Sequence, residues 1–131
     1  MNGTAHDPAN GPAPVPAVIL HLALDADWQN ARTTGEYRVS TLGRTLEQEG
    51  FIHACADRAQ LDGVADRFYR DVTEPLTLLT IDPTGLDVRM EPPAGPPATP
   101  APDPAPTETF PHVYGPIPLS AVVTTTPFTL P

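Results

Sequence analysis

Short apolar runs rich in β-branched residues predict the strands of this chain. In residues 18–23, Val-Ile-Leu-His-Leu-Ala, side chains alternate between two faces, so Ile19, His21 and Ala23 share one face of the expected strand. The later runs are shorter or more continuously apolar, which is typical of buried strands. The further expected strands cover 51–54, 76–81, 86–91 and 121–126, with a turn at 82–85.

The segments between the first two of these strands have apolar residues at helical spacing and predict helices. Asp25 is placed to cap a helix that carries Trp28 inward and stops at Gly35, a residue suited to the left-handed position after a last helical turn. Residues 42–49 contain two leucines four positions apart and predict a second, short helix that ends at Gly50.

A third helix is expected from residue 58 to about residue 69. Asp57 and Gln60 have the spacing of a capping box, and apolar residues follow at helical intervals. Helices near the front of the chain and strands near its end indicate an α+β fold, and no internal repeat is present.

Two proline-rich segments limit the part of the chain that can pack. Residues 1–17 and 92–107 are dominated by Pro, Ala and Gly, and proline both fixes φ and removes a backbone donor. We expect the first segment to be a disordered tail and the second a surface loop. The remaining chain is the size of one domain, so we expect a single domain over 18–130.

The charge of the chain narrows its class of partner. Sixteen acids oppose seven bases, for a formal net charge of −9. Nucleic-acid binders neutralise phosphates with clustered bases, so no nucleic-acid partner is expected, whereas a small nucleotide is compatible with this balance. No apolar run is long enough to span a membrane, and Cys55 is the only cysteine, so we expect a cytoplasmic protein without an internal disulfide. Its oligomeric state is left open.

Three histidines stand in short apolar stretches far apart in the chain. They are His21, His53 and His112. A neutral imidazole carries one donor and one acceptor, and its burial is costly unless both are paired. Three such residues predict a shared pocket. Pro111 and Gly115 indicate that His112 lies in a shaped loop, and loops of this kind often carry function.

Several segments resemble a known family. Val-Ile-Leu-His-Leu-Ala, Glu-Gly-Phe-Ile-His, Leu-Leu-Thr-Ile-Asp-Pro and Phe-Pro-His-Val-Tyr-Gly occur in one consistent order over most of residues 18–123. They resemble the bacterial domain-of-unknown-function family nine-five-two. Members of that family look like small relatives of the ADP-ribosyltransferase fold, particularly the RNA 2′-phosphotransferases. The resemblance implies a curved, split, mixed or antiparallel sheet with two or three short helices and NAD as the substrate held in a cleft.

The resemblance also implies roles for named residues. His21 falls where the fold places a first-strand histidine that binds the ribose and nicotinamide part of NAD, and His53 falls on the second strand. His112 falls near the strand on which related enzymes carry a catalytic glutamate, and no glutamate stands there. Glu91 is the substitute candidate for stabilising a ribosyl cation. Tyr114 is expected to stack on a flat ligand.

Three functions follow from these residues. The first is an ADP-ribosyltransferase-like domain that binds NAD or a related nucleotide and transfers or hydrolyses ADP-ribose. The second is a non-catalytic small-molecule-binding domain of the same fold, because the usual glutamate is missing. The third is a metal-dependent enzyme with three histidine ligands, since three imidazoles and a water form an open zinc site. Histidines separated by 32 and 59 residues are unusual for such a site, so no metal is assigned.

Overall fold

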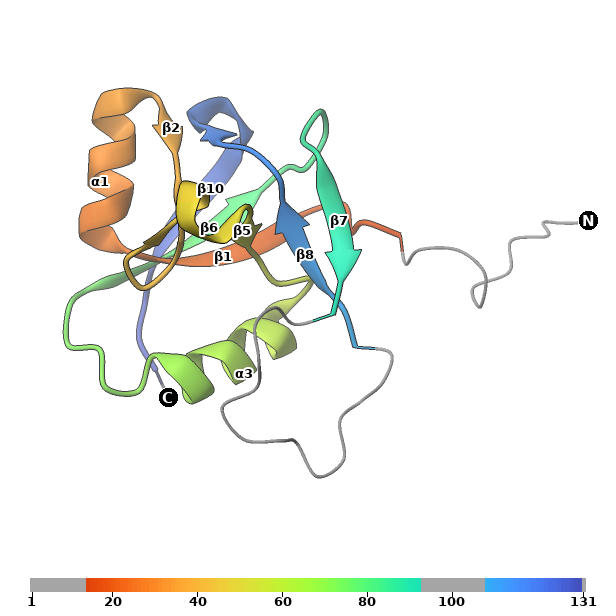
Figure 1. The fold of residues 1–131 in the computed structure, drawn as a ribbon. Coiled ribbons are helices and arrows are strands. Elements are labelled where there is room, and N and C mark those ends of the chain that lie inside the picture. Colours follow the sequence, from red (N-terminus) through yellow and green to blue (C-terminus); the bar gives the residue numbers. More distant parts are fainter. Residues whose placement is uncertain (1–13, 93–107, 131) are drawn as a thin grey trace, which may run out of the picture.

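A computed structural model describes residues 14–92 and 108–130 and has an α+β architecture with antiparallel sheets and few helices (Figure 1). The expected tail lies mostly, and the expected surface loop almost entirely, outside the described residues. The helices are α1 (Asp25–Thr34), α2 (Leu46–Glu49), α3 (Arg58–Phe68) and a 3-10 turn at Leu119–Ala121. The strands are β1 (Ile19–Leu24), β2 (Glu36–Tyr37), β3 (Val39–Thr41), β4 (Arg44–Thr45), β5 (Ile52–His53), β6 (Leu76–Ile81), β7 (Val88–Glu91), β8 (Phe110–Val113), β9 (Ile117–Pro118) and β10 (Val122–Phe128).

Two three-stranded antiparallel sheets make up the body of the fold. One has the order β1-β6-β10 and the other the order β5-β8-β7, while β2 pairs with β9 and β3 with β4. In the part of the chain that the structure describes, a single bridge joins the two larger sheets. Leu20 and Cys55 exchange two backbone hydrogen bonds there, at 2.8 and 2.7 Å. Beyond this bridge β1 and β5 separate, so the larger sheets form a split surface.

The two faces of β1 pack against different helices. Ile19 and Ala23 belong to a core cluster with Trp28 of α1, whereas Leu22 belongs to a second cluster with Leu61 of α3. Alternation along the strand therefore places α1 and α3 on opposite faces, in agreement with their positions in Figure 1. Each fully buried aliphatic side chain contributes roughly 1.5–3 kcal/mol of transfer free energy.

The ends of α1 and α2 show which local signals were reliable. Gly35 and Gly50 follow these helices with φ of 99° and 88°, as expected for left-handed caps. The predicted cap at Asp25 is wrong. Leu24 occupies the capping position, and the Asp25 carboxylate instead accepts a hydrogen bond from Thr77 of β6 at 2.8 Å. The Asp25 side chain therefore makes a tertiary hydrogen bond to a neighbouring strand instead of capping the helix, as the local pattern had predicted.

The helix predicted over 42–49 begins four residues later than expected. Leu42 and Gly43 form the turn of the β3–β4 hairpin, with φ of 37° and 82°. Thr45 then starts α2 through a capping box with Gln48, in which each side chain bonds the other's backbone N–H. The turn conformation required at Leu42 is incompatible with a helix at that point.

The segment around His112 is a strand rather than the predicted loop. β8 lies between β5 and β7, and all four of its residues are buried. The carbonyl of Pro111 accepts a hydrogen bond from the Ala54 N–H at 2.9 Å. Pairing on both sides outweighs the turn signal from Pro111, which removes one donor but leaves its acceptor available.

The predicted start of α3 is confirmed and is testable. The Asp57 carboxylate accepts the Gln60 N–H at 2.9 Å, and the Gln60 side chain accepts the Ala56 N–H one residue before the cap. We expect Asp57→Ala to lower the free energy of unfolding by about 1 kcal/mol, because the Gln60 N–H at the helix start loses its side-chain acceptor.

The matched control is Asp66→Ala, which removes only the exposed ion pair with Arg70. It is expected to change stability by less than about 0.5 kcal/mol. Urea unfolding followed by circular dichroism measures both variants. Equal losses for Asp57→Ala and Asp66→Ala would contradict the capping role.

Candidate functional site

The candidate site lies where β1 and β5 separate after the Leu20–Cys55 bridge. If the ladder continued, the His53 carbonyl would be paired by the backbone of β1. Instead the His21 ring occupies the gap, and its Nδ1–H donates to the His53 carbonyl oxygen at 2.6 Å. A side chain thereby replaces a backbone pairing, and the split is held open by a specific contact.

Both ring nitrogens of His21 are used within the protein. Because Nδ1 carries the proton donated to His53, Nε2 is an acceptor, and the Tyr37 hydroxyl donates to it at 3.0 Å. His21 is 2% exposed, and burial lowers its pKa to about 4. The ring is a neutral structural link between β1, β5 and β2. The structure gives it no free nitrogen for the ribose contact expected from the sequence.

His53 is positioned by its backbone and leaves its ring available. Its N–H donates to the Ser40 hydroxyl at 3.0 Å, which connects β5 to β3. The ring packs beside His112 at a centroid distance of 5.5 Å and beside Phe110 at 5.1 Å. Burial, followed by the neighbouring His112 and His21, lowers the pKa of His53 to about 4. The ring is therefore neutral near pH 7.

His112 is directly opposite His53 in the β5–β8 register and has a carboxylate partner. Its Nδ1–H donates to Glu91 Oε1 at 2.8 Å, and the Tyr114 hydroxyl donates to the same oxygen. These hydrogen bonds, Tyr114's foremost, hold the pKa of Glu91 below its ordinary value. The predicted residues His53, His112, Glu91 and Tyr114 thus lie together on one face of a sheet.

The other nitrogen of His112 has no hydrogen-bond partner within residues 14–92 and 108–130. This atom, Nε2, is buried in a side chain that is 2% exposed. Glu91 fixes the proton on Nδ1, so Nε2 presents a lone pair. An unpaired buried acceptor costs about 1–3 kcal/mol, so the fold keeps this group at the expense of stability.

Aromatic and charged side chains frame His112. Phe51 stacks on the imidazole with ring centroids 4.1 Å apart and planes 15° apart. The Arg89 guanidinium lies 4.2 Å from the centroid of the Tyr114 ring and is itself bound to Asp87. One face of Tyr114 is therefore already covered by a cation, which leaves less of the ring for the stacking expected from the sequence.

Comparison with known proteins places the chain in a family. The family model described as "Protein of unknown function (DUF952)" matches residues 22–125. The chain belongs to the DUF952 family. The match confirms the resemblance seen in the Gly-Phe-Ile-His and Phe-Pro-His-Val-Tyr-Gly segments. No curated protein matches this chain.

Solved structures similar to this DUF952 domain come from Caulobacter crescentus. The crystal structure of protein CC0527 has a TM-score of 0.66 and 26% sequence identity, covering 87% of this chain and 88% of that chain. The solution NMR structure of CC0527 has a TM-score of 0.59 and 21% identity, covering 88% and 87%. These similarities support the mixed α+β fold with antiparallel sheets.

In the described part of this chain, no helix has the length and apolar character needed to cross a membrane.

The cavity at the split of this DUF952 domain is small. It borders His21, His53, Ser40 and Thr41 and has a volume of about 10 Å³, which is room for one water at most. His112 does not line it. This cavity therefore brings together two of the three predicted histidines. His21 lies on the face of β1 that packs on α1, while His53 and His112 share the α3 face. Val64 of α3 and Tyr69, which directly follows this helix, also line the cavity.

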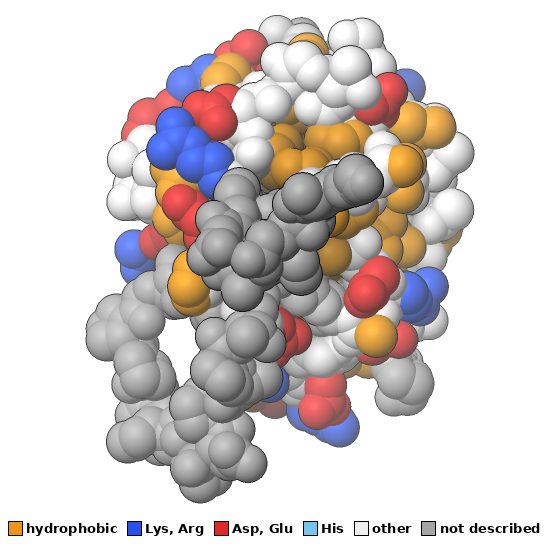
Figure 2. Space-filling model, turned by 90° about the vertical axis from the view of Figure 1, so that its right-hand side faces the viewer, with side chains coloured by type: hydrophobic (Ala, Val, Ile, Leu, Met, Phe, Trp, Pro, Cys, Tyr) orange, Lys and Arg blue, Asp and Glu red, His pale blue; other side chains and the backbone are white. Residues whose placement is uncertain are grey.

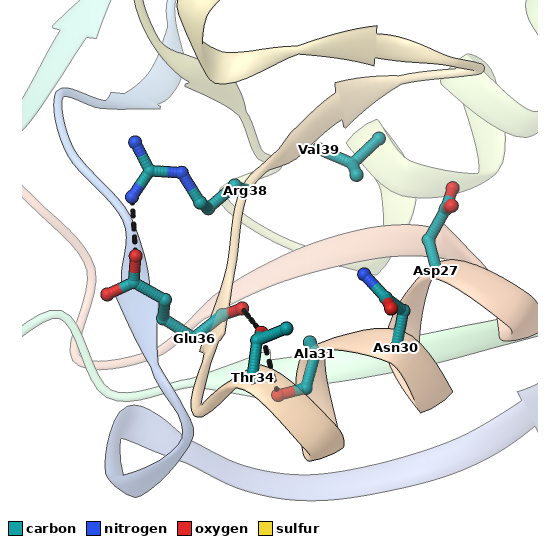
Figure 3. Close-up of a pocket in the computed structure, with 7 residues that line it drawn as sticks. All are labelled: Asp27, Asn30, Ala31, Thr34, Glu36, Arg38 and Val39. Atoms are coloured by element: carbon teal, nitrogen blue, oxygen red, sulfur yellow. Dashed lines mark hydrogen bonds and ion pairs between the residues drawn. The ribbon is translucent and has the colours of Figure 1, made fainter.

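Several larger cavities lie away from the predicted residues. One, of about 180 Å³, is formed by α1 and β2–β3, where Arg38 is paired with Glu36 (Figure 3). Arg38 also pairs with Glu47. Arg38 is the only arginine among the described residues that line this cavity, and both of its partners are carboxylates. These residues therefore offer no unpaired positive charge with which to bind a phosphate. Another, of about 320 Å³, borders Val15 and Val88. Apolar side chains also gather on the face shown in Figure 2, which is the right-hand side of Figure 1.

A three-histidine metal site is not supported by the donor geometry. Among residues 14–92 and 108–130, no three His, Cys, Asp or Glu side chains are arranged to hold a metal ion. The physical reason is the hydrogen bonding of His21, both of whose nitrogens are engaged by the protein. Cys55 is buried, and burial raises the pKa of its thiol to about 12, which is the opposite of a reactive thiolate.

Two residues of this site were missed by the sequence analysis. Tyr37 and Ser40 hold the rings and backbone of the histidines, yet they lie in a segment where no periodicity marks a strand. β2 and β3 are only two and three residues long. β2 pairs with β9, which is distant in the sequence, and β3 pairs with β4 across a tight turn. The single available signal was a tyrosine shortly after a helix-ending glycine.

The low pKa of His21 gives a pH prediction. Between pH 6.5 and about 4 the unfolded chain binds a proton at His21 and the native state does not. The contribution of His21 to the free energy of unfolding is therefore complete above pH 6.5. It decreases as the pH falls towards 4, by about 3 kcal/mol for a pKa shift of this size. Urea unfolding at pH 7.5 and pH 4.5 measures the loss.

His21→Gln is the matched variant, because its amide can still donate to the His53 carbonyl but does not titrate. We expect the variant to lose less stability than the wild type between the two pH values, with the difference assigned to His21. An identical loss in both proteins would show that His21 is not the group responsible.

Proposed function

We propose that this DUF952 domain is ADP-ribosyltransferase-like and binds NAD or a related nucleotide against the face that carries His53 and His112. The observation that carries the proposal is the buried His112 Nε2, which has no partner in the described part of the chain. Buried polar atoms in native proteins are almost always paired, so an exception near other polar side chains favours a ligand-binding role.

The chemistry of Nε2 specifies what the ligand must present. Glu91 holds the proton on Nδ1, so the free nitrogen accepts a hydrogen bond. A ribose hydroxyl or the amide group of nicotinamide supplies such a donor. Both hydrogen bonds to Glu91 reach Oε1, and the side chain is 32% exposed, so Oε2 is available for a second ribose hydroxyl.

Glu91 is also the residue we propose for catalysis. When the bond from ribose to nicotinamide breaks, the electron pair leaves with nicotinamide and positive charge develops on the ribosyl ring. A carboxylate beside that ring stabilises the charge. Water or another hydroxyl then adds to the ribosyl carbon and releases a proton. His112 and Tyr114 hold Glu91 in its ionised form through their hydrogen bonds.

The split arrangement of the sheets supports the fold resemblance. Two antiparallel sheets diverge from the Leu20–Cys55 bridge, as the resemblance to the ADP-ribosyltransferase fold implies. The cavity at the split holds one water at most, so we propose that nucleotide binding displaces side chains above it. Half-buried Thr41, on the short β3–β4 hairpin, is the nearest candidate for such a movement.

A thermal-unfolding experiment with millimolar NAD tests the proposal. A ligand at about 100 times its dissociation constant adds about 2.7 kcal/mol, which is a rise of several degrees in Tm for a domain of this size. The informative variant is His112→Phe, which keeps an aromatic ring against Phe51 and removes the unpaired nitrogen.

We expect His112→Phe to abolish the rise with NAD while leaving the Tm without ligand equal to or above that of the wild type. Thr84→Ala, in the exposed β6–β7 turn, is the control and should keep the full rise. A wild type that shows no rise, or a variant that keeps it, would contradict the proposed site.

Nicotinamide release separates the catalytic proposal from the non-catalytic alternative. If the wild-type protein releases nicotinamide from NAD, the Glu91→Gln variant should no longer release it. The variant should still show the rise in Tm with NAD. A rise in Tm without release would favour the non-catalytic small-molecule-binding domain, in which the engaged Glu91 has only a positioning role.

A further inference from the structure

β10 is an outer strand with an open edge. In the β1-β6-β10 sheet it pairs with β6 on one side, and within the described residues no strand lies on its other side. The side chains from Val123 to Pro127 are all exposed, although four of the five are β-branched residues, which are typical of paired strands. An edge of this kind presents unpaired backbone donors and acceptors to a further strand.

The edge also lacks the charges that usually protect such strands. All acids and bases of the chain precede Thr109, and residues 109–131 contain no Asp, Glu, Lys or Arg. Natural edge strands are commonly blocked by lysine or an inward charge. In β10 the irregular features are a bulge at Val123, which has no partner in β6, and Pro127.

We infer that β10 pairs antiparallel with β10 of a second copy of this chain, about a two-fold axis at Thr125. This register places Thr125 opposite its own copy and Thr124 opposite Thr126. Threonine pairs across antiparallel strands are favourable, and no like charges meet. The two-fold relation needs only one self-complementary surface, which is the commonest form of homodimer.

Pro127 is compatible with this register. Proline occurs in edge strands where its nitrogen, which has no hydrogen, faces away from the sheet. If Pro127 faces outward, Thr125 does so too, because backbone directions alternate along a strand. Thr125 then exchanges its N–H and carbonyl with the partner's Thr125, and Pro127 contributes its carbonyl.

A groove beside β10 provides space for the side chains of the added strand. It has a volume of about 430 Å³ and lies between α1 and β10, with Trp28, Leu119 and Val122 among its lining residues. In the proposed register Pro127 of the second copy lies opposite Val123, at the mouth of this groove. Apolar contact with the Trp28 side of the groove would add to the backbone pairing.

Charge favours a second copy as the occupant. The formal charge is −9, so two copies that met through most of their surface would bring acids together. β10 avoids this repulsion because it carries none, and the one ionic side chain lining the groove is Arg32. A strand without charge meets no like charge at this edge, and β10 itself is such a strand, extended and rich in β-branched residues.

Sedimentation velocity of the whole chain at increasing concentration tests this inference. We expect wild-type protein to form a dimer at high micromolar concentration. Thr125→Lys would place two ammonium groups opposite each other at the axis and should shift the dissociation constant at least tenfold. Ala59→Lys, exposed on α3, adds the same charge elsewhere and should leave the dimer intact.

Circular dichroism establishes that both variants are folded. A wild type that remains a monomer at high micromolar concentration overturns the inference, as does a Thr125→Lys dimer with wild-type affinity. If Thr125→Lys proves unfolded, Thr125→Pro, which removes one outward donor without charge, is measured in its place. Its failure to weaken the dimer would equally overturn the inference.

Discussion

The hydrogen bond from the His21 ring to the His53 carbonyl is the contact on which this structure depends. β1 and β5 share one bridge and then diverge, which leaves a strand carbonyl without a backbone donor. His21 supplies the donor, and Tyr37 fixes the other side of the ring. Since Tyr37 lies on β2, the same imidazole connects both larger sheets to the β2–β9 pair.

The arrangement separates structural from available histidines. His21 has both nitrogens paired and is held neutral, so its contribution is to the fold. Among the described residues, His112 has one nitrogen paired to Glu91 and one without a partner, and His53 lies beside it on the same face. Maintaining an unpaired acceptor in the protein interior lowers stability, and proteins accept such losses mainly at functional sites.

Local signals in the sequence predicted much of the fold. The strand over 76–81 has the predicted bounds, because a long apolar run with β-branched residues has few alternatives. The ends of α1 and α2 at Gly35 and Gly50 were predicted from glycine's freedom at positive φ. The errors at Asp25 and over 42–49 arose where a distant partner or a tight turn outweighed local preference.

The site was predictable in its members but not in its geometry. Apolar surroundings identified the three histidines, and the family resemblance drew attention to Glu91 and Tyr114. Which histidine would be free depended on strand pairing across long sequence distances. The contacts of His21 with residues 16 and 32 positions away, and the burial of Pro111 in a central strand, have no local signal.

The most direct test of the account is a long-range ¹H–¹⁵N NMR spectrum of the histidine side chains with and without NAD. We expect His21 and His112 both to carry their proton on Nδ1, and NAD to shift the Nε2 resonance of His112 while leaving that of His21 unchanged. A proton on Nε2 of His112, or a His112 resonance that does not respond to NAD while that of His21 does, would contradict it.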